Sequence, residues 1–223
     1  MLKQTNLART EALTLTGDTQ SLAEQLGSVA GLAALGAAVA VLPPGRIDSL
    51  PALRDFLLHY QAQVLIPLEL PAIFRASALT SEGKTRELIA LDQSLAGELA
   101  LRDFAAASRR AGQSQLRRLR PLRDHRVVQR YLRAVETGQA HGWHTLAYGV
   151  TLAVYSLPLR QGLHNYARQT MWGFIQAAHR TVEFSENEGA NLLGELSAHW
   201  PPAIEAALDV VDGDDHSARK RES

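Results

Sequence analysis

The 223-residue chain contains no cysteine. This absence excludes a disulfide scaffold, a zinc–thiolate site, an iron–sulfur cluster and a cysteine nucleophile. β-Branched aliphatic residues are scarce, since Val and Ile together number 18 whereas Leu and Ala number 35 and 34. Unbranched side chains lose little rotamer freedom in a helix, so this ratio favours helices and argues against a β-rich fold. The formal net charge is zero, and composition alone points to no particular chemistry.

Sequence motifs of the common catalytic folds are absent as well. The chain has no phosphate-binding GxxxxGK[ST] loop, no GxGxxG turn and no GxSxG nucleophile elbow. No stretch assembles a nucleophile, a base and a residue that orients them. We therefore predict that the protein is not an enzyme and that it has no catalytic residue.

Two pairs of potential metal ligands remain. His141 and His144 are three residues apart and could share a helix face. Glu195 and His199 are four residues apart. Two ligands without further partners make a weak metal site, so packing or surface roles are the favoured interpretation. We predict no metal site and no bound cofactor.

The N-terminal residues lack the features of a targeting segment. Residues 1–15 include charged side chains and have no continuous apolar stretch. Residues 25–45 carry no charge, but most are Ala and Gly, and Pro43 and Pro44 end the run. Small residues contribute little to membrane insertion, so we expect a buried helix here rather than a membrane span. The expected location is the cytoplasm.

Helical spacing recurs along the chain with short breaks, and Ser185 followed by Glu188 is typical of a capping box that opens a helix. We predict an all-α fold with a single domain of about ten short helices over residues 18–211. Residues 1–17 would form a flexible extension, and the polar residues 212–223 a tail that is disordered when free. The predicted helices are 20–41, 49–63, 67–78, 81–97, 99–118, 124–138, 142–156, 158–183, 186–198 and 201–211.

Positive charge is concentrated in one segment. Ten arginines but only two acidic residues lie from Arg102 to Arg133, and Arg126 and Arg130 share a helix face with Arg133. Such a stripe could bind phosphates, dock an acidic partner or simply face solvent. Nucleic-acid-binding proteins usually add lysines or stacking aromatics, and this segment has no lysine and, after Phe104 near its start, only Tyr131. Protein contact or plain surface is therefore favoured over nucleic-acid binding.

Five short segments occur in a characteristic order. In order and spacing they resemble the urease accessory protein UreF family from about residue 50 to residue 209. The family patterns that they resemble are L-x-x-L-D at residues 88–92, A-S-x-x-x-G at 107–112, G-H-x-x-x-x-F-G at 142–149, G-L-P-L-x-x-A-L at 156–163 and Q-T-D-G-Q-x-L-L at 186–193.

Two family segments differ in this chain. Of the opening motif, residues 22–32 keep only Leu26, Gly31 and Leu32, and the C-terminal end lacks the family's apolar pair. Two alternatives therefore stay open beside a urease accessory role. One is a diverged UreF-like scaffold for another partner, and the other is an arginine-rich, nucleic-acid-binding helical module.

The resemblance implies an all-helical UreF-like bundle without catalysis of its own. Members of the family dimerise and act between UreD, also called UreH, and the GTPase UreG. The complex inserts nickel into apo-urease, and the UreF component is thought to modulate GTP hydrolysis. Nickel would pass through the complex as cargo, without a dedicated site in this chain.

The resemblance also implies roles for particular residues. Arg180 occupies the position of the family's Lys or Arg at the end of a long helix, and Glu186 occupies the position of a family glutamine. Both would bind a partner or line a polar passage, although an arginine at a helix C-terminus is also favoured by the helix dipole. The glycines of the family-like motifs would permit close helix approach or an unusual backbone angle. They are Gly112, Gly142, Gly149 and Gly189.

Overall fold

A computed structural model describes residues 47–206 and residue 208. Every regular element in these residues is helical and none is a strand, which confirms the predicted all-α fold. The predictions for residues 1–17, 20–41 and 212–223 lie outside the described residues. The elements are α3 (Leu50–Tyr60), the π-helix η1 (Gln61–Glu69), α4 (Leu70–Ser81), α5 (Thr85–Leu95), the 3-10 helix η2 (Leu99–Phe104), α6 (Ala105–Arg118), α7 (Arg126–Glu136), α8 (His144–Val154), α9 (Leu159–Ala178) and α10 (Glu186–Ser197).

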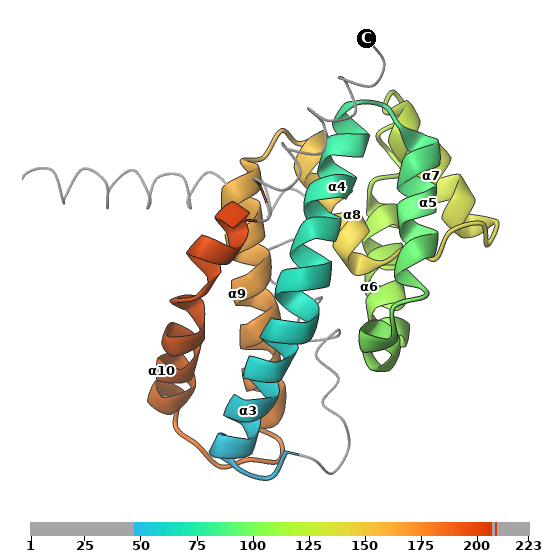
Figure 1. Cartoon of the computed structure of the whole chain (residues 1–223). Coiled ribbons are helices and arrows are strands. Elements are labelled where there is room, and N and C mark those ends of the chain that lie inside the picture. The colour runs from blue at the N-terminus through green and yellow to red at the C-terminus, as the bar shows by residue number, and fades with distance from the viewer. Residues whose placement is uncertain (1–46, 207, 209–223) are drawn as a thin grey trace, which may run out of the picture.

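One long rod, made of α3, η1 and α4, crosses the molecule (Figure 1). Helices α9 and α10 lie on one side of this rod, and α5, α6 and α7 lie on the other. Helix α8 is the link, because it packs against both α4 and α6. The fold therefore has two flanks that meet at the rod and at α8.

The rod corrects one expectation from the sequence. Helices 49–63 and 67–78 were expected to be separate, with a break before Pro67, but the chain stays helical from Leu50 to Ser81. A proline inside an α-helix removes a hydrogen bond and clashes with the carbonyl four residues earlier. Here Pro67 lies within the wider π-helical segment η1, so the axis continues without a break.

By length and composition, this rod is the one helix in the described part of the chain that could cross a membrane. Yet 44% of its apolar window is buried inside the protein. Leu53, Leu57 and Leu65 are fully buried and belong to the hydrophobic core. The apolar character of the rod is thus explained by its place at the centre of a helical domain.

Aromatic side chains join the rod to the α9 flank. The ring of Tyr60 packs edge-to-face against Phe174 of α9 and against Phe104 of η2. The distances between ring centroids are 4.7 Å and 5.2 Å, respectively. Phe56 adds a further edge contact to Phe174 at 5.2 Å. Each such pair contributes about 0.5–1.5 kcal/mol beyond the area that it buries.

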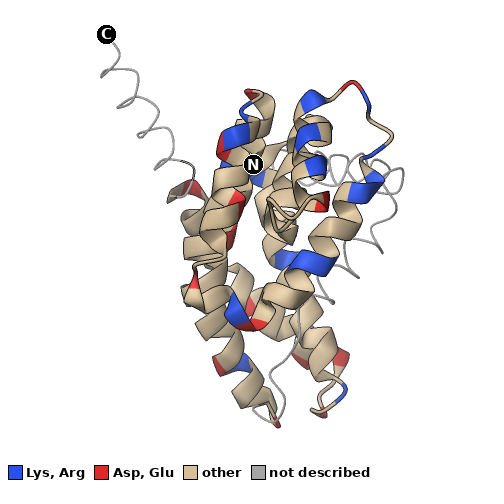
Figure 2. Ribbon diagram, turned by 90° about the vertical axis from the view of Figure 1, so that its right-hand side faces the viewer, with Lys and Arg blue, Asp and Glu red and all other residues tan. Residues whose placement is uncertain are grey.

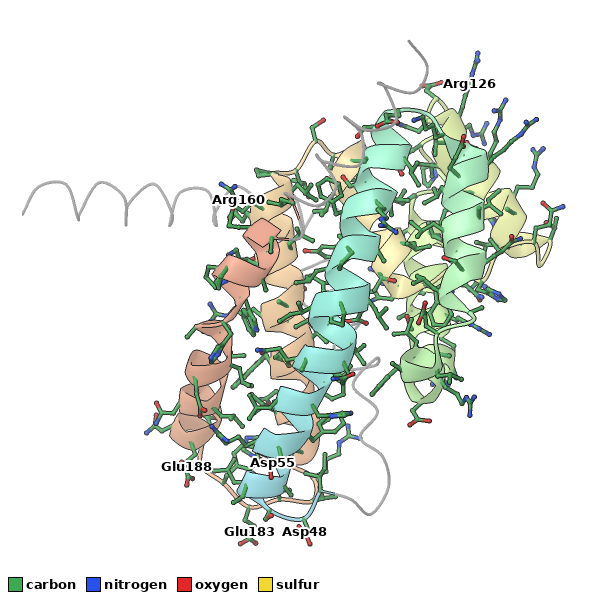
Figure 3. The ribbon with its side chains drawn as sticks, viewed as in Figure 1. Asp48, Asp55, Arg126, Arg160, Glu183 and Glu188 are labelled. Carbon is green, nitrogen blue, oxygen red and sulfur yellow. The ribbon has the colours of Figure 1, made fainter. Side chains whose placement is uncertain are left out.

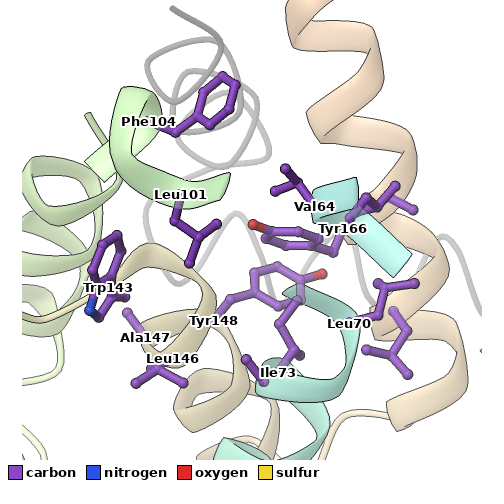
Figure 4. Packing of buried hydrophobic residues seen from close by; sticks show 14 of the residues in the cluster. Val64, Leu70, Ile73, Leu101, Phe104, Trp143, Leu146, Ala147, Tyr148 and Tyr166 are labelled. Carbon is purple, nitrogen blue, oxygen red and sulfur yellow. The ribbon is translucent and has the colours of Figure 1, made fainter. Parts of the chain in front are cut away.

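Helix α8 is buried on almost every side, since all residues from His144 to Leu152 are buried. Its close approach to α4 requires a glycine. A Cβ atom at Gly149 would lie 2.4 Å from the carbonyl oxygen of Ile73 and 2.9 Å from the Cβ of Ala76. Figure 4 shows the core around α8, including Leu146, Tyr148 and Tyr166.

Helix α10 begins as the sequence predicted. The hydroxyl of Ser185 accepts a hydrogen bond from the Glu188 amide at 3.2 Å, and the Glu188 carboxylate accepts one from the Ser185 amide at 2.8 Å. The capping box is therefore confirmed. Helix α9 ends earlier than the predicted residue 183, because turns follow Ala178, in which the amides of Thr181 and Val182 donate to its carbonyl.

Candidate functional site

Three of the family-like segments meet at the start of α8, where a carboxylate is buried. Asp92, from α5, is fully buried. It accepts hydrogen bonds from the backbone amide of Gly142 at 2.8 Å and from the hydroxyl of Tyr131 at 2.7 Å, and also from the amide of His141. Its own carbonyl oxygen accepts a bond from the Trp143 indole at 3.0 Å. Segments 88–92 and 142–149 are thus joined through Asp92.

The third segment, 107–112, closes the same junction from α6. The hydroxyl of Ser108 accepts a hydrogen bond from the His144 amide at 3.2 Å. A Cβ atom at Gly112 would lie only 2.2 Å from the carbonyl oxygen of Gly142 and 2.5 Å from the carbonyl carbon of Trp143. Gly142 has a φ of 72°, which side chains other than glycine rarely adopt.

Together these contacts fix the start of α8. The first amides of a helix have no partner within it. Here the hydroxyl of Ser108 accepts a hydrogen bond from the amide of His144, the first residue of α8, and Asp92 accepts hydrogen bonds from the amides of the three residues that lead into the helix. A carboxylate is also favoured at the positive end of the helix dipole. Because its side-chain oxygens are already hydrogen-bonded, Asp92 is suited to holding α5, α7 and α8 together rather than to chemistry.

The role of Asp92 was not predicted from the sequence, although the sequence contains a signal for it. Asp92 lies on the same face of α5 as Leu88 and Leu95, at a spacing of three to four residues, and all three are buried. An acidic residue on an apolar helix face needs hydrogen-bond partners elsewhere in the fold. That pattern indicates a buried carboxylate but does not say which amides bind it.

A second cluster of buried polar side chains lies around Glu69, at the end of η1. Glu69 is buried, and its carboxylate accepts a hydrogen bond from the Tyr60 hydroxyl at 2.8 Å. Burial raises the pKa of Glu69 to about 7, although hydrogen bonds from Tyr60 and Tyr166 oppose the rise. The contact from Tyr166 falls short of good hydrogen-bond geometry. Glu69 therefore titrates close to neutral pH.

His144 lies next to this group. Its ring stacks on Tyr166 at 5.4 Å, and neither ring nitrogen has a hydrogen-bond partner among the described residues. Burial lowers the pKa of His144 to about 4. The imidazole is thus neutral at physiological pH, which favours a packing role.

Replacing Glu69 with glutamine should change stability in a pH-dependent way. The pKa of Glu69 is higher in the folded chain than in the unfolded chain, so its contribution to stability is fully present below about pH 4.5 and is lost as the pH rises through about 7. Glu69→Gln removes this loss, and thermal unfolding should show the variant gaining about 2 kcal/mol relative to wild type between about pH 5 and pH 8.

His144 changes the stability of the fold with pH in the opposite direction. Because burial lowers its pKa, its contribution to stability is fully present above about pH 6.5 and is lost as the pH falls through about 4. Both proteins contain His144, so its effect cancels in the difference between them. A difference that does not change with pH would contradict the assignment of a raised pKa to Glu69.

Arg180 and Glu186 both lie at the turn between α9 and α10. Each is exposed, and Arg180 follows the end of α9 while Glu186 is the first residue of α10. The Arg180 side chain makes no ion pair with any residue that the structure describes. The same end of the bundle presents several acidic side chains, of which Asp55, Glu183 and Glu188 are labelled in Figure 3.

Packing fixes this turn in place. The rings of His179 and Phe184 stack at 3.9 Å. A Cβ atom at Gly189 would lie 3.1 Å from both Ile175 and Phe184, so glycine lets α10 approach α9 closely. Arg180 and Glu186 are therefore displayed on an ordered surface.

A groove of about 590 Å³ runs between α9 and α10. Trp172, Arg168 and Gln169 line it from α9, and Leu193 lines it from α10. The sequence contains no signal for this groove, because a groove depends on how two helices pack against each other. The α10 wall has small residues, namely Ala190, Gly194 and Ser197.

The structure does not bring together a metal site within residues 47–206. No group of three or more His, Asp or Glu side chains there is placed to hold an ion. His141 and His144 do not share a helix face, because α8 begins only at His144. Glu195 is instead paired across the surface with Arg54 of α3.

Comparison with known proteins gives a consistent result. The profile of the UreF family matches residues 47–197, which is more than half of the 223-residue chain. The matched region includes every element from α3 to α10, and the helical residues 200–206 follow it. No curated protein shows a significant match to the chain.

Proposed function

The chain belongs to the UreF family, which implies an accessory role in urease maturation, and from this premise we propose that it is a non-catalytic scaffold for nickel insertion. The family match over residues 47–197 carries the proposal. The packing supports it, because the carboxylate of Asp92 is committed to hydrogen bonds that join helices. A scaffold needs such rigidity, since a partner surface must keep its shape.

The proposed partners are UreD (UreH), the GTPase UreG and apo-urease. We propose that the chain forms a homodimer in the cytoplasm and modulates GTP hydrolysis by UreG. Nickel would be cargo of the complex, and the chain itself would hold no cofactor. The exposed turn that carries Arg180 and Glu186 is a suitable contact surface, because Arg180 has a planar guanidinium that can bind a carboxylate through two hydrogen bonds.

Deleting the chain in its host tests the proposal directly. Urease activity should fall even when nickel is supplied in excess, and the full-length chain should restore it. The tagged chain should also purify with UreD and UreG. Unchanged urease activity, or purification without either protein, would favour a diverged scaffold for another partner.

Arg180→Ala tests the surface assignment separately from the fold. An exposed substitution away from the core should change the free energy of unfolding by less than about 0.5 kcal/mol. Urease activation should nevertheless fall about fivefold, because removing one charge-assisted contact costs about 1 kcal/mol of assembly. Arg75→Ala, on an exposed position of α4, is the matched control. Equal activation by both variants would show that Arg180 is only a helix-end residue.

A further inference from the structure

The arginine-rich segment forms one exposed face of the folded domain. In Figure 2 the basic residues gather over the end of α6, the connecting residues 119–125 and α7. Figure 3 shows the side chain of Arg126 pointing away from the helices. We call this surface the arginine face. Its exposed members are Arg110, Arg117, Arg118, Arg120, Arg123, Arg126, Arg130 and Arg133.

Most of this charge is not neutralised within the described chain. Arg120 pairs with Glu136, whereas Arg117, Arg123, Arg126, Arg130 and Arg133 make no ion pair with any described residue. Like charges at neighbouring positions on a helix repel. In addition, α7 begins at Arg126 with no acidic residue in its first turn, and a cation is unfavourable at that end of the helix dipole. An anionic partner would relieve both effects.

The connecting segment is held in a fixed shape. The side-chain amide of Gln129 donates hydrogen bonds to the carbonyl oxygens of Arg120 at 3.1 Å and of Leu122 at 3.0 Å. Leu119 is buried in the core beneath them. The backbone that carries the arginines is therefore ordered before any partner binds, which lowers the entropic cost of association.

We propose that the arginine face is a docking surface for a carboxylate-rich segment of a partner protein. Arginine binds carboxylates through two parallel hydrogen bonds, and residues 102–133 contain ten arginines and no lysine. Opposite charge would steer the partner to this face and orient it on arrival. The proposal stands apart from the urease role, since it rests on charge and geometry alone.

Three observations favour protein carboxylates over nucleic acid. The chain has a formal net charge of zero, whereas nucleic-acid-binding domains are usually strongly basic. Residues 102–133 contain one Tyr and one Phe and no Trp. Tyr131 is fully buried and bonded to Asp92, and Phe104 is buried in the core, so neither ring can stack on bases. Gln129, which could otherwise read a base edge, has its amide group committed to the backbone.

Charge reversal on α7 tests the proposal. Fluorescence anisotropy would follow binding of a labelled decaglutamate peptide to the full chain, to Arg126→Glu/Arg130→Glu and to the control Arg75→Glu/Arg168→Glu. The control changes net charge equally at exposed sites on α4 and α9. At about 50 mM salt the face variant should bind about tenfold more weakly than wild type, and the control less than about twofold more weakly. Circular dichroism would check that each variant is folded.

Other outcomes would overturn the proposal. Absence of peptide binding by the wild type, or equal loss in the two variants, would show that the face has no particular affinity for carboxylates. A single-stranded oligonucleotide of equal charge and a short duplex provide the competing probes. If either binds the wild type more tightly than the peptide and depends on Arg126 and Arg130, the face is a nucleic-acid surface instead.

Discussion

Replacing Gly112 with alanine is expected to lower the free energy of unfolding by more than about 3 kcal/mol, because overpacking against backbone cannot be relieved by a side-chain rotation. The added Cβ would meet the Gly142 carbonyl oxygen at 2.2 Å and the His144 amide nitrogen at 2.6 Å. These atoms belong to the start of α8, which is anchored by Asp92. Thermal or urea unfolding measures the effect.

Gly194→Ala is the matched control. Gly194 also lies inside a helix, but no atom lies within 4 Å of the position of an added Cβ. Alanine has the higher helix propensity, so this variant should be more stable than wild type by up to about 1 kcal/mol. If Gly112→Ala were as stable as Gly194→Ala, α6 and the start of α8 would not approach as closely as described.

Asp92→Asn is the second substitution with a large expected effect. The carboxylate oxygens accept hydrogen bonds from three backbone amides, those of residues 141–143, and from the Tyr131 hydroxyl. Asparagine keeps one acceptor oxygen but turns an amide group toward donors. Leaving buried donors unsatisfied at this junction should cost about 3 kcal/mol in the free energy of unfolding. Chemical denaturation followed by circular dichroism provides the measurement.

Asp55→Asn makes the same chemical change at an exposed position of α3 and should alter stability by less than about 0.5 kcal/mol. Hydrogen exchange adds a local readout, since the amides of His141 and Gly142 should lose protection in Asp92→Asn. Similar stability of the two variants would mean that Asp92 does not hold the start of α8.

Local sequence signals were sufficient for the class of fold and for several helix ends. The excess of Leu and Ala over Val and Ile predicts helices, and the described residues are helical without strands. Ser185 and Glu188 form the predicted capping box, because both partners lie within one turn of the chain. The break expected before Pro67 was wrong, since proline propensity refers to α-helix and the structure places Pro67 in a π-helix.

The candidate site could be predicted only in part. The resemblance to a family marked segments 88–92, 107–112 and 142–149, but not the contacts between them. The pair His141 and His144 suggested ligands on one face, whereas the structure buries His144 at the start of α8. Burial depends on which helices cover a residue, and periodicity within a single helix does not contain that information.

By itself, the sequence determined that this chain is helical, where several helices begin and that ten arginines are concentrated between residues 102 and 133. The tertiary structure decided that Asp92 binds the Gly142 amide 50 residues further along the chain, that burial raises the pKa of Glu69 to about 7 and that most of these arginines are exposed. The physical reason is the distance along the chain over which each interaction acts. Helix propensity and capping act over about four residues, whereas burial, pKa and surface charge arise where distant segments pack together.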